Sequence, residues 1–175
     1  VRQATLDAVA RSGAATLIVT HDTEEALRAA HSLIVMRQGA IVQTGTPEAI
    51  YSRPASAAIA SALGPVNLFS GRVSSGDAVF ALGRALTPLA DDSVVDVIIR
   101  EEGLLLTPAH AKPGQVGTPT AQVLAVRRTG PQVLVEIVLA SGEHARALVA
   151  PGAAPMVGDT VSVTIDPSLT FVFAR

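Results

Sequence analysis

The strongest chemical signal in the sequence is His21, which follows a short apolar run and precedes an acidic segment. Residues 16–19 are apolar or β-branched and predict a buried strand. Residues 22–25 predict the start of a helix, because acidic side chains suit the positive end of the helix dipole and Asp22 with Glu25 has capping-box spacing. A histidine at such a corner of an α/β sheet is placed to contact an anionic ligand such as a phosphate. The alternative interpretation is a structural histidine at a strand end.

The chain on both sides of this corner has the patterns of short helices and strands. Apolar periodicity and turn residues predict helices over residues 2–11 and 22–30, strands over residues 33–36 and 40–43, a helix that starts at Pro47, and a helix from Pro54 to Leu63. Gly64 and Pro65 then end the helical half of the chain. Residues 1–64 are therefore expected to form an α/β piece that carries the histidine corner.

Residues 65–175 have the pattern of an all-β domain. Short alternating runs separated by glycines predict strands over residues 67–73, 79–82, 94–100, 104–107, 120–126, 133–139, 144–149, 160–165 and 170–173. Strands at such close spacing, with almost no helical periodicity between them, are typical of a small barrel or sandwich. Two domains are expected, with the boundary after residue 64.

Composition excludes several functional classes. The chain has 175 residues, no cysteine and a formal net charge of −2, so it offers no disulfide framework, no thiolate metal site and little attraction for nucleic acid. No apolar run approaches the roughly 18 residues that a membrane helix needs, and residues 1–11 lack the pattern of a signal peptide. These features predict a soluble chain. It begins with Val1 rather than methionine, as a fragment or a processed product would.

The surroundings of His21 read VTHDTEEAL and continue as LIVMRQGAIVQTGTPEAIYSRPAS. This text resembles, almost position for position, the switch-histidine segment of ABC transporter ATPases and its continuation. In that family the histidine contacts the γ-phosphate of ATP and the attacking water. The resemblance implies a catalytic role for His21, with ATP and Mg²⁺ as cofactors of the full-length protein.

The second half of the chain resembles the regulatory TOBE-type domain that follows importer ATPases. The matching segments read VNLFSGRV, VIIREEGLLL and GDTVSVTIDPS. The family usually has Ile-Arg-Pro-Glu where this chain has Arg100, Glu101 and Glu102, so the match departs by one residue. The fold class implied is an α/β fragment, the C-terminal part of an ABC ATPase domain, followed by an all-β, OB-like barrel in residues 65–175.

Most of an ATPase site is missing from the sequence. There is no G-x-x-x-x-G-K-[ST] phosphate loop, no LSGGQ-like signature and no apolar strand ending in Asp-Glu. Phosphoryl transfer requires nucleotide, metal and water to be positioned together. The chain alone is therefore expected to be inactive. His21 is the only site residue predicted, and no residue is assigned to a cofactor or a metal.

The resemblance also implies partners and a location. A complete subunit of this kind pairs with a second copy of itself, docks on membrane-spanning permease subunits and lies in the cytoplasm on the inner face of the cell membrane. The short regulatory domain looks most like that of ferric-iron importers, with polyamine importers close behind. Self-association has a further reason in the sequence, because a strand over residues 16–20 with two apolar faces leaves edges that invite pairing.

Two other functions compete with this interpretation. TOBE-type domains resemble molybdate-binding proteins, so the β domain is alternatively a small-oxyanion module in which the backbone of residues 67–71 and Gly130 supplies donors. Single-stranded nucleic-acid binding, which OB folds also perform, is disfavoured by the 3% aromatic content and the negative charge. The remaining histidines, His31, His110 and His144, are expected to have structural roles.

Overall fold

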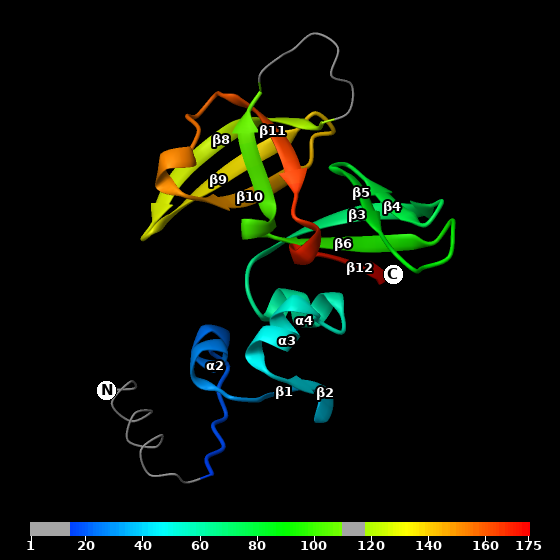
Figure 1. Cartoon of the computed structure of the whole chain (residues 1–175), viewed down its shortest axis with the longest axis vertical. Helices are drawn as coiled ribbons and strands as arrows, with labels where there is room; N and C mark the ends of the chain where they lie inside the picture. Colours follow the sequence, from blue (N-terminus) through cyan, green and yellow to red (C-terminus); the bar gives the residue numbers. More distant parts are fainter. Residues whose placement is uncertain (1–14, 110–117) are drawn as a thin grey trace. The chain divides into compact units, whose positions relative to one another are not determined.

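A computed structural model describes residues 15–109 and 118–175 of the chain (Figure 1). The chain divides into two compact units, Val1–Ala55 and Ser56–Arg175. The helix predicted over residues 2–11 lies outside the described residues, as does His110. Within the described residues, no helix is both long enough and apolar enough to span a lipid bilayer.

The first unit consists of short helices and one β-hairpin. Its described elements are α2 (Thr23–Ala29), β1 (Leu33–Arg37), β2 (Ala40–Gly45) and α3 (Pro47–Ser52). The hairpin prediction is confirmed: β1 and β2 pair antiparallel, and Gln38 and Gly39 turn the chain with φ values of 52° and 79°. The predicted start of α3 is also confirmed, because the Thr46 hydroxyl accepts a hydrogen bond from the Ala49 N–H and Pro47 lies in the first turn.

The strand predicted over residues 16–20 is not formed, and this prediction is wrong. Residues 15–20 belong to no helix or strand, and Leu17 and Val19 are 82% and 92% exposed. A β-strand needs a neighbour for its N–H and C=O groups, and β1 and β2 pair only with each other. The predicted α/β fold is therefore not seen in the described part of the first unit.

The second unit contains two five-stranded antiparallel sheets. The first, named here the β3 sheet, has the order β12-β6-β3-β4-β5. Its strands are β3 (Val66–Ser74), β4 (Asp77–Phe80), β5 (Gly83–Leu86), β6 (Val94–Arg100) and β12 (Thr170–Ala174). The second, the β8 sheet, has the order β10-β9-β8-β11-β7. Its strands are β7 (Leu104–Pro108), β8 (Thr120–Thr129), β9 (Gln132–Leu139), β10 (His144–Val149) and β11 (Thr160–Ile165).

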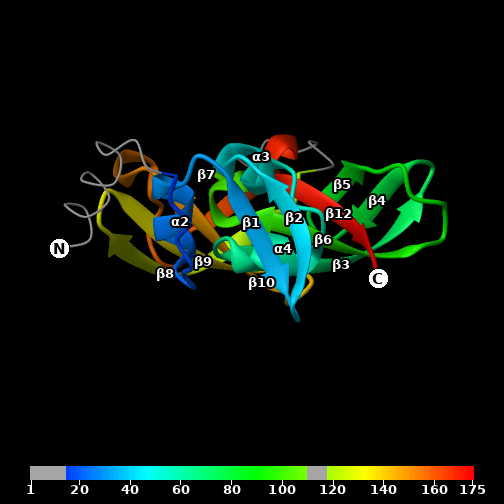
Figure 2. The same ribbon diagram turned by 90° about the horizontal axis from the view of Figure 1, so that it is seen from below.

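The core of this unit is built from the inward-facing side chains of both sheets. Along β9, Val133, Val135 and Ile137 are buried and alternate with more exposed neighbours, as expected for a strand with one face in the core. Phe69 of β3 and Val97 of β6 belong to the same apolar cluster. The β4–β5 and β8–β9 hairpins project from opposite sides of the unit (Figures 1 and 2). The prediction of an all-β domain after the helices is confirmed.

The β8 sheet curls into a half-barrel that stays open on one side. Its edge strands β7 and β10 approach each other in space, but no ladder joins them. The 3₁₀ turn η1 (Glu101–Gly103), which leads from β6 into β7, lies against β10. We call the opening between β7 and β10 the seam. The curled sheet is consistent with the OB-like barrel that the sequence predicted, although strand pairing does not close it.

Helix α4 (Ala57–Ala62) belongs to the second unit. At the end of β6, the Arg100 side chain is completely buried, and its Nη1 donates to the carbonyl oxygen of Ala60 at 3.3 Å. The same guanidinium lies 5.7 Å from the centroid of the Phe171 ring. Ile59 of α4 is 5% exposed. The boundary between the units thus falls before α4, whereas the sequence placed it after residue 64.

Candidate functional site

His21 lies in a tight turn that leads into α2. Asp22 is the N-cap of this helix, and its carboxylate accepts a hydrogen bond from the Glu25 N–H at 3.0 Å. The Thr20 hydroxyl accepts from the Asp22 N–H at 3.0 Å and donates to the Glu25 carboxylate at 3.2 Å. Asp22 therefore caps the helix as predicted. These contacts fix the main chain on both sides of His21.

The His21 side chain itself is exposed. Glu24 in the first turn of α2 is exposed too, and it pairs with Arg28 at 3.3 Å. Carboxylates beside His21 oppose the binding of an isolated phosphate, so this corner needs cationic groups from elsewhere to become a phosphate site. Among the described residues, no three His, Asp or Glu side chains are grouped so that they could hold a metal ion.

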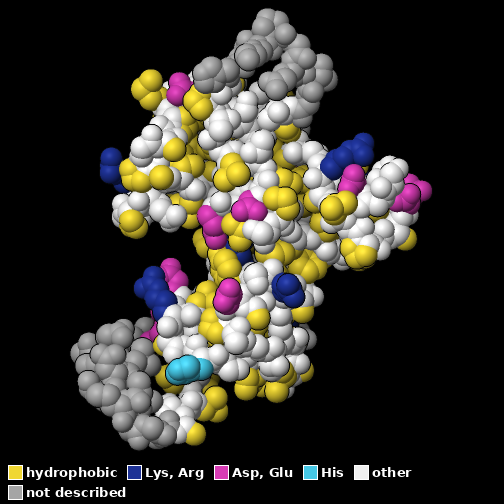
Figure 3. Space-filling model, viewed as in Figure 1, with side chains coloured by type: hydrophobic (Ala, Val, Ile, Leu, Met, Phe, Trp, Pro, Cys, Tyr) yellow, Lys and Arg dark blue, Asp and Glu magenta, His cyan; other side chains and the backbone are white. Residues whose placement is uncertain are grey.

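Large apolar side chains are exposed on the first unit as well. Figure 3 shows hydrophobic side chains gathered over β1 and β2. Ile34 and Met36 of β1 are 52% and 61% exposed, and Ile41 of β2 is 61% exposed. Met36 is paired with Ile41 across the hairpin, and we call Ile34, Met36 and Ile41 the apolar face of the first unit. Leu17 and Val19, in the segment before the histidine corner, are exposed apolar residues as well. Exposed apolar side chains in such number mark a surface that another protein surface covers.

The donors predicted for an oxyanion in the β domain are not brought together. Residues 67–71 of β3 pair with β6. The hydrogen bonds between these two strands use every second backbone N–H group of this segment. The Asn67 carboxamide binds both main-chain groups of Arg146. Gly130, with φ 77°, turns the chain between β8 and β9 in the other sheet. These residues form no common anion cradle.

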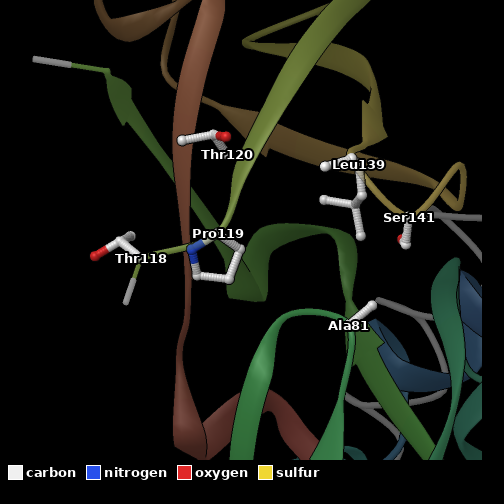
Figure 4. Close-up of a pocket in the computed structure, with 7 residues that line it drawn as sticks. Ala81, Thr118, Pro119, Thr120, Leu139 and Ser141 are labelled. Atoms are coloured by element: carbon white, nitrogen blue, oxygen red, sulfur yellow. The ribbon is translucent and has the colours of Figure 1, made fainter. Parts of the chain in front are cut away.

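The described residues of the second unit line hollows, two of which bear on the question of an anion site. The first, of about 310 Å³, is lined by Ala81, Thr118, Pro119, Thr120, Leu139, Ala140 and Ser141 (Figure 4). Its side-chain polar groups are hydroxyls, and without a charged group among these residues it lacks the strong partner that an anion requires. The second, of about 260 Å³, is lined by Val66, Asn67, Leu68, Glu136, His144, Ala145 and Arg146. This second hollow borders a group of buried polar contacts.

Three polar contacts converge on Arg146 in edge strand β10. Its N–H donates to Oδ1 of Asn67 at 2.7 Å, and its C=O accepts from Nδ2 of Asn67 at 2.8 Å. Its Nε lies 2.9 Å from Oε1 of Glu101 in η1. Asn67 and Glu101 are only 6% and 4% exposed. We call these three residues the Arg146 cluster. One sequence feature points to it: Glu101 stands where the resembling family usually has proline.

Burial raises the pKa of Glu101, although the neighbouring Arg146 guanidinium lowers it and Glu102 raises it further. A carboxyl group with a raised pKa binds its proton more tightly in the folded than in the unfolded chain. Glu101 therefore stabilises the folded chain fully at pH values below the ordinary carboxyl pKa of 4.5. This stabilisation is lost as the pH rises through the higher pKa that Glu101 has in the folded chain. At neutral pH the ionised Glu101 carboxylate is costly to bury, because its partner Arg146 is itself half-exposed.

We expect Glu101→Gln to become more favourable relative to wild type as the pH rises from about 4 to about 7. The amide keeps nearly the same shape beside Arg146, but it no longer buries a charge. Urea unfolding of both proteins at several pH values measures the difference in free energy of unfolding. Glu136→Gln, which removes a carboxylate paired with Arg127 at 3.2 Å nearer the surface, serves as the control. A difference that falls with pH would contradict the prediction.

Known proteins match both units of the chain. Residues 97–173 match the TOBE domain family. The sn-glycerol-3-phosphate import ATP-binding protein UgpC of Paraburkholderia xenovorans is 40% identical over 119 residues, which are 64% of this chain and 33% of UgpC. The sulfate/thiosulfate import ATP-binding protein CysA of Methylococcus capsulatus is 35% identical over 133 residues, which are 74% of this chain and 36% of CysA. The spermidine/putrescine import ATP-binding protein PotA of Borreliella afzelii is 37% identical over 100 residues, 55% of this chain and 29% of PotA.

Among solved structures, the cytoplasmic molybdate-binding protein ModG aligns with a TM-score of 0.51 and 17% identity, covering 62% of this chain and 96% of ModG. At that identity the likeness concerns the fold alone. The chain is similar to the C-terminal, TOBE-containing portion of ABC importer ATP-binding subunits, as the sequence predicted, and the alignment with CysA covers 74% of it. It spans about a third of the length of UgpC and CysA.

Proposed function

We propose that this chain forms the switch-histidine corner and the regulatory domain of the ATP-hydrolysing subunit of an ABC importer. The observation that carries the proposal is that the similarity to such subunits runs through both units. The CysA alignment covers 74% of the 175 residues, or about 130, whereas Ser56–Arg175 contains only 175 − 55 = 120. Part of the first unit must therefore lie within the alignment.

In this role His21 contacts the γ-phosphate of ATP and the attacking water. The frame made by Thr20, Asp22 and Glu25 orients the main chain at His21, and the exposed imidazole is available to a nucleotide held by other residues. Mg²⁺, when bound, offsets the negative charge of the phosphates and of the nearby carboxylates. The groups that hold ATP and Mg²⁺ belong to a phosphate-loop portion that this sequence does not contain.

The apolar face of the first unit, together with Leu17 and Val19, is where we place that phosphate-loop portion. Leu17 and Val19 directly precede the histidine corner and are almost fully exposed. Covering them removes apolar area from water at about 25 cal/mol per Å², which favours association. Because they lie next to Thr20, the same contact holds the corner against the nucleotide site.

Supplying the missing portion as a separate chain tests the proposal. The phosphate-loop portion of the CysA relative is co-purified with this chain, and ATP hydrolysis is measured. We expect turnover only when both are present, with neither hydrolysis nor micromolar ATP binding by this chain alone. Met36→Asp combined with Ile41→Asp should abolish association. Leu68→Asp, at a residue 60% exposed in the second unit, is the matched control. Turnover by this chain alone would contradict the proposal.

For the transported substrate we propose ferric iron, with polyamines as the alternative, on the basis of the sequence resemblance. The relatives named above import sn-glycerol 3-phosphate, sulfate or thiosulfate, and spermidine or putrescine. Uptake of labelled ferric iron, measured in cells with and without the complete subunit, distinguishes these substrates. Uptake of spermidine instead of iron would establish the alternative.

We also propose that the subunit works as a pair at the inner face of the membrane, bound there by permease subunits. In the isolated chain, where no phosphate-loop portion covers it, the exposed apolar face is a further physical reason to associate with a second copy. Light scattering at micromolar concentration is expected to show a mass above that of the 17.9 kDa monomer. The Met36→Asp and Ile41→Asp pair should return the chain to a monomer. A monomeric wild-type chain would contradict this part of the proposal.

A further inference from the structure

A side chain, rather than a strand, occupies the open edge of β10. Arg146 is in register with Glu136 of β9, yet its N–H and C=O both bind the Asn67 carboxamide. At this position the main-chain groups of β10 therefore face away from β9. A carboxamide offers the same donor and acceptor as a peptide group. Among the described residues, no strand pairs with β10 on this side. The Asn67 side chain makes the two hydrogen bonds that one residue of such a strand would make.

The Arg146 cluster is also what bridges the seam. Asn67 belongs to β3, and Glu101 belongs to η1, the turn that leads into β7. Both hold Arg146, whereas β7 and β10 share no ladder. The two fully inward-facing residues nearest to the cluster on β10 are the small Ala145 and Ala147. Because alanine buries little apolar area, polar contacts at one residue provide much of the attachment of β10 on this side.

The chain next to the cluster is not closely packed. The hollow of about 260 Å³ runs between residues 66–68 of β3 and residues 144–146 of β10. Leu68, His144 and Arg146, which line this hollow, are exposed, so the hollow is an open groove and little buried contact joins β3 to β10 along it. On the other side of β10, in contrast, a continuous register of residue pairs joins it to β9.

From these observations we propose that β10 is a latched strand. The Arg146 cluster holds the seam shut, and when the cluster is broken β10 moves away from the β3 sheet while its ladder with β9 and the rest of the unit stay folded. The edge strand β10 of the regulatory domain can then move, and the three side chains of the Arg146 cluster control its position. This opening is a local transition, distinct from global unfolding.

Engineered thiols test the latch, because the chain has no native cysteine. Ala147→Cys places a thiol on the inner face of β10, at a residue 0% exposed. Ala121→Cys places one at a residue 3% exposed in β8, away from the seam, and is the matched control. A thiol reagent labels each site only when it opens. Labelling rates in low concentrations of urea separate local opening, which depends weakly on urea, from global unfolding.

The decisive variant is Asn67→Leu, which keeps the size of the side chain but removes both hydrogen bonds to Arg146. We expect it to speed labelling at Ala147→Cys at least about tenfold, as for the loss of one or two hydrogen bonds, with a weak dependence on urea. The labelling rate at Ala121→Cys should increase only by the factor that corresponds to the measured loss in the free energy of global unfolding. Arg146→Met, which removes the contact with Glu101, should act in the same direction and replaces Asn67→Leu if that variant does not fold.

Arg84→Ala is the control for the loss of an arginine–carboxylate pair in the same unit, since Arg84 pairs with Asp77 at 3.5 Å in the β4–β5 hairpin, away from the seam. It should leave the ratio of the two labelling rates unchanged. Equal acceleration at both thiols in Asn67→Leu would mean that the cluster contributes only to global stability. The latch proposal would also be wrong if the labelling rate at Ala147→Cys depended on urea as strongly as global unfolding does.

Discussion

Replacing His21 with alanine, in an ATPase assembled from this chain and a phosphate-loop portion, is expected to lower ATP turnover about 100-fold or more. Nucleotide affinity should change by less than about threefold. The imidazole acts on the γ-phosphate and the water in the transition state, while most of the contacts that bind ATP come from other residues. Steady-state turnover and calorimetric ATP affinity of the same preparation measure the two effects.

Neighbouring variants separate catalysis from structure at this corner. His31→Ala removes an exposed histidine just after α2 and should leave turnover unchanged. Thr20→Val keeps the shape of the side chain but removes the hydroxyl that binds Asp22 and Glu25, so a smaller loss is expected. If His21→Ala reduced binding and turnover equally, His21 would be a structural residue, the alternative that its position in the sequence leaves open.

Removing α4 is expected to destabilise the β domain strongly. A chain of residues 65–175 should be less stable than one of residues 56–175 by roughly 3–6 kcal/mol, the value of burying two large aliphatic side chains. Those side chains are Ile59 and Leu63, which are 5% and 7% exposed. The truncation also removes Ala60, whose carbonyl oxygen accepts from the buried Arg100 guanidinium. Urea unfolding of both chains gives the difference directly.

The contribution of the helix can be isolated within the longer chain. Ile59→Ala should account for a large share of the loss, because it removes buried aliphatic atoms and leaves a cavity. Ala58→Ser, at an exposed position on the same helix, is the mild control. Equal stability of the two chain lengths would show that the β domain begins at residue 65, as the sequence suggested.

Local patterns were sufficient for most of the elements. The Gln38-Gly39 turn, the cap at Thr46 and the alternation along β9 each depend on residues a few positions apart, and the structure shows all three. The apolar run at residues 16–20 failed as a strand for the opposite reason. Its pattern states only that the segment prefers burial, and a strand also requires a neighbour that no local pattern supplies.

By itself, the sequence indicated the similarity to importer ATP-binding subunits, the start of a helix after His21 and the all-β character of the second half, because these follow from short motifs and periodicity. Only the tertiary structure assigned α4 to the β domain and brought Asn67, Glu101 and Arg146 together. Asn67 and Arg146 are 79 positions apart and come from different sheets. Such contacts depend on how two sheets are placed against each other. That placement follows from the packing of the whole core, which no short stretch of sequence encodes.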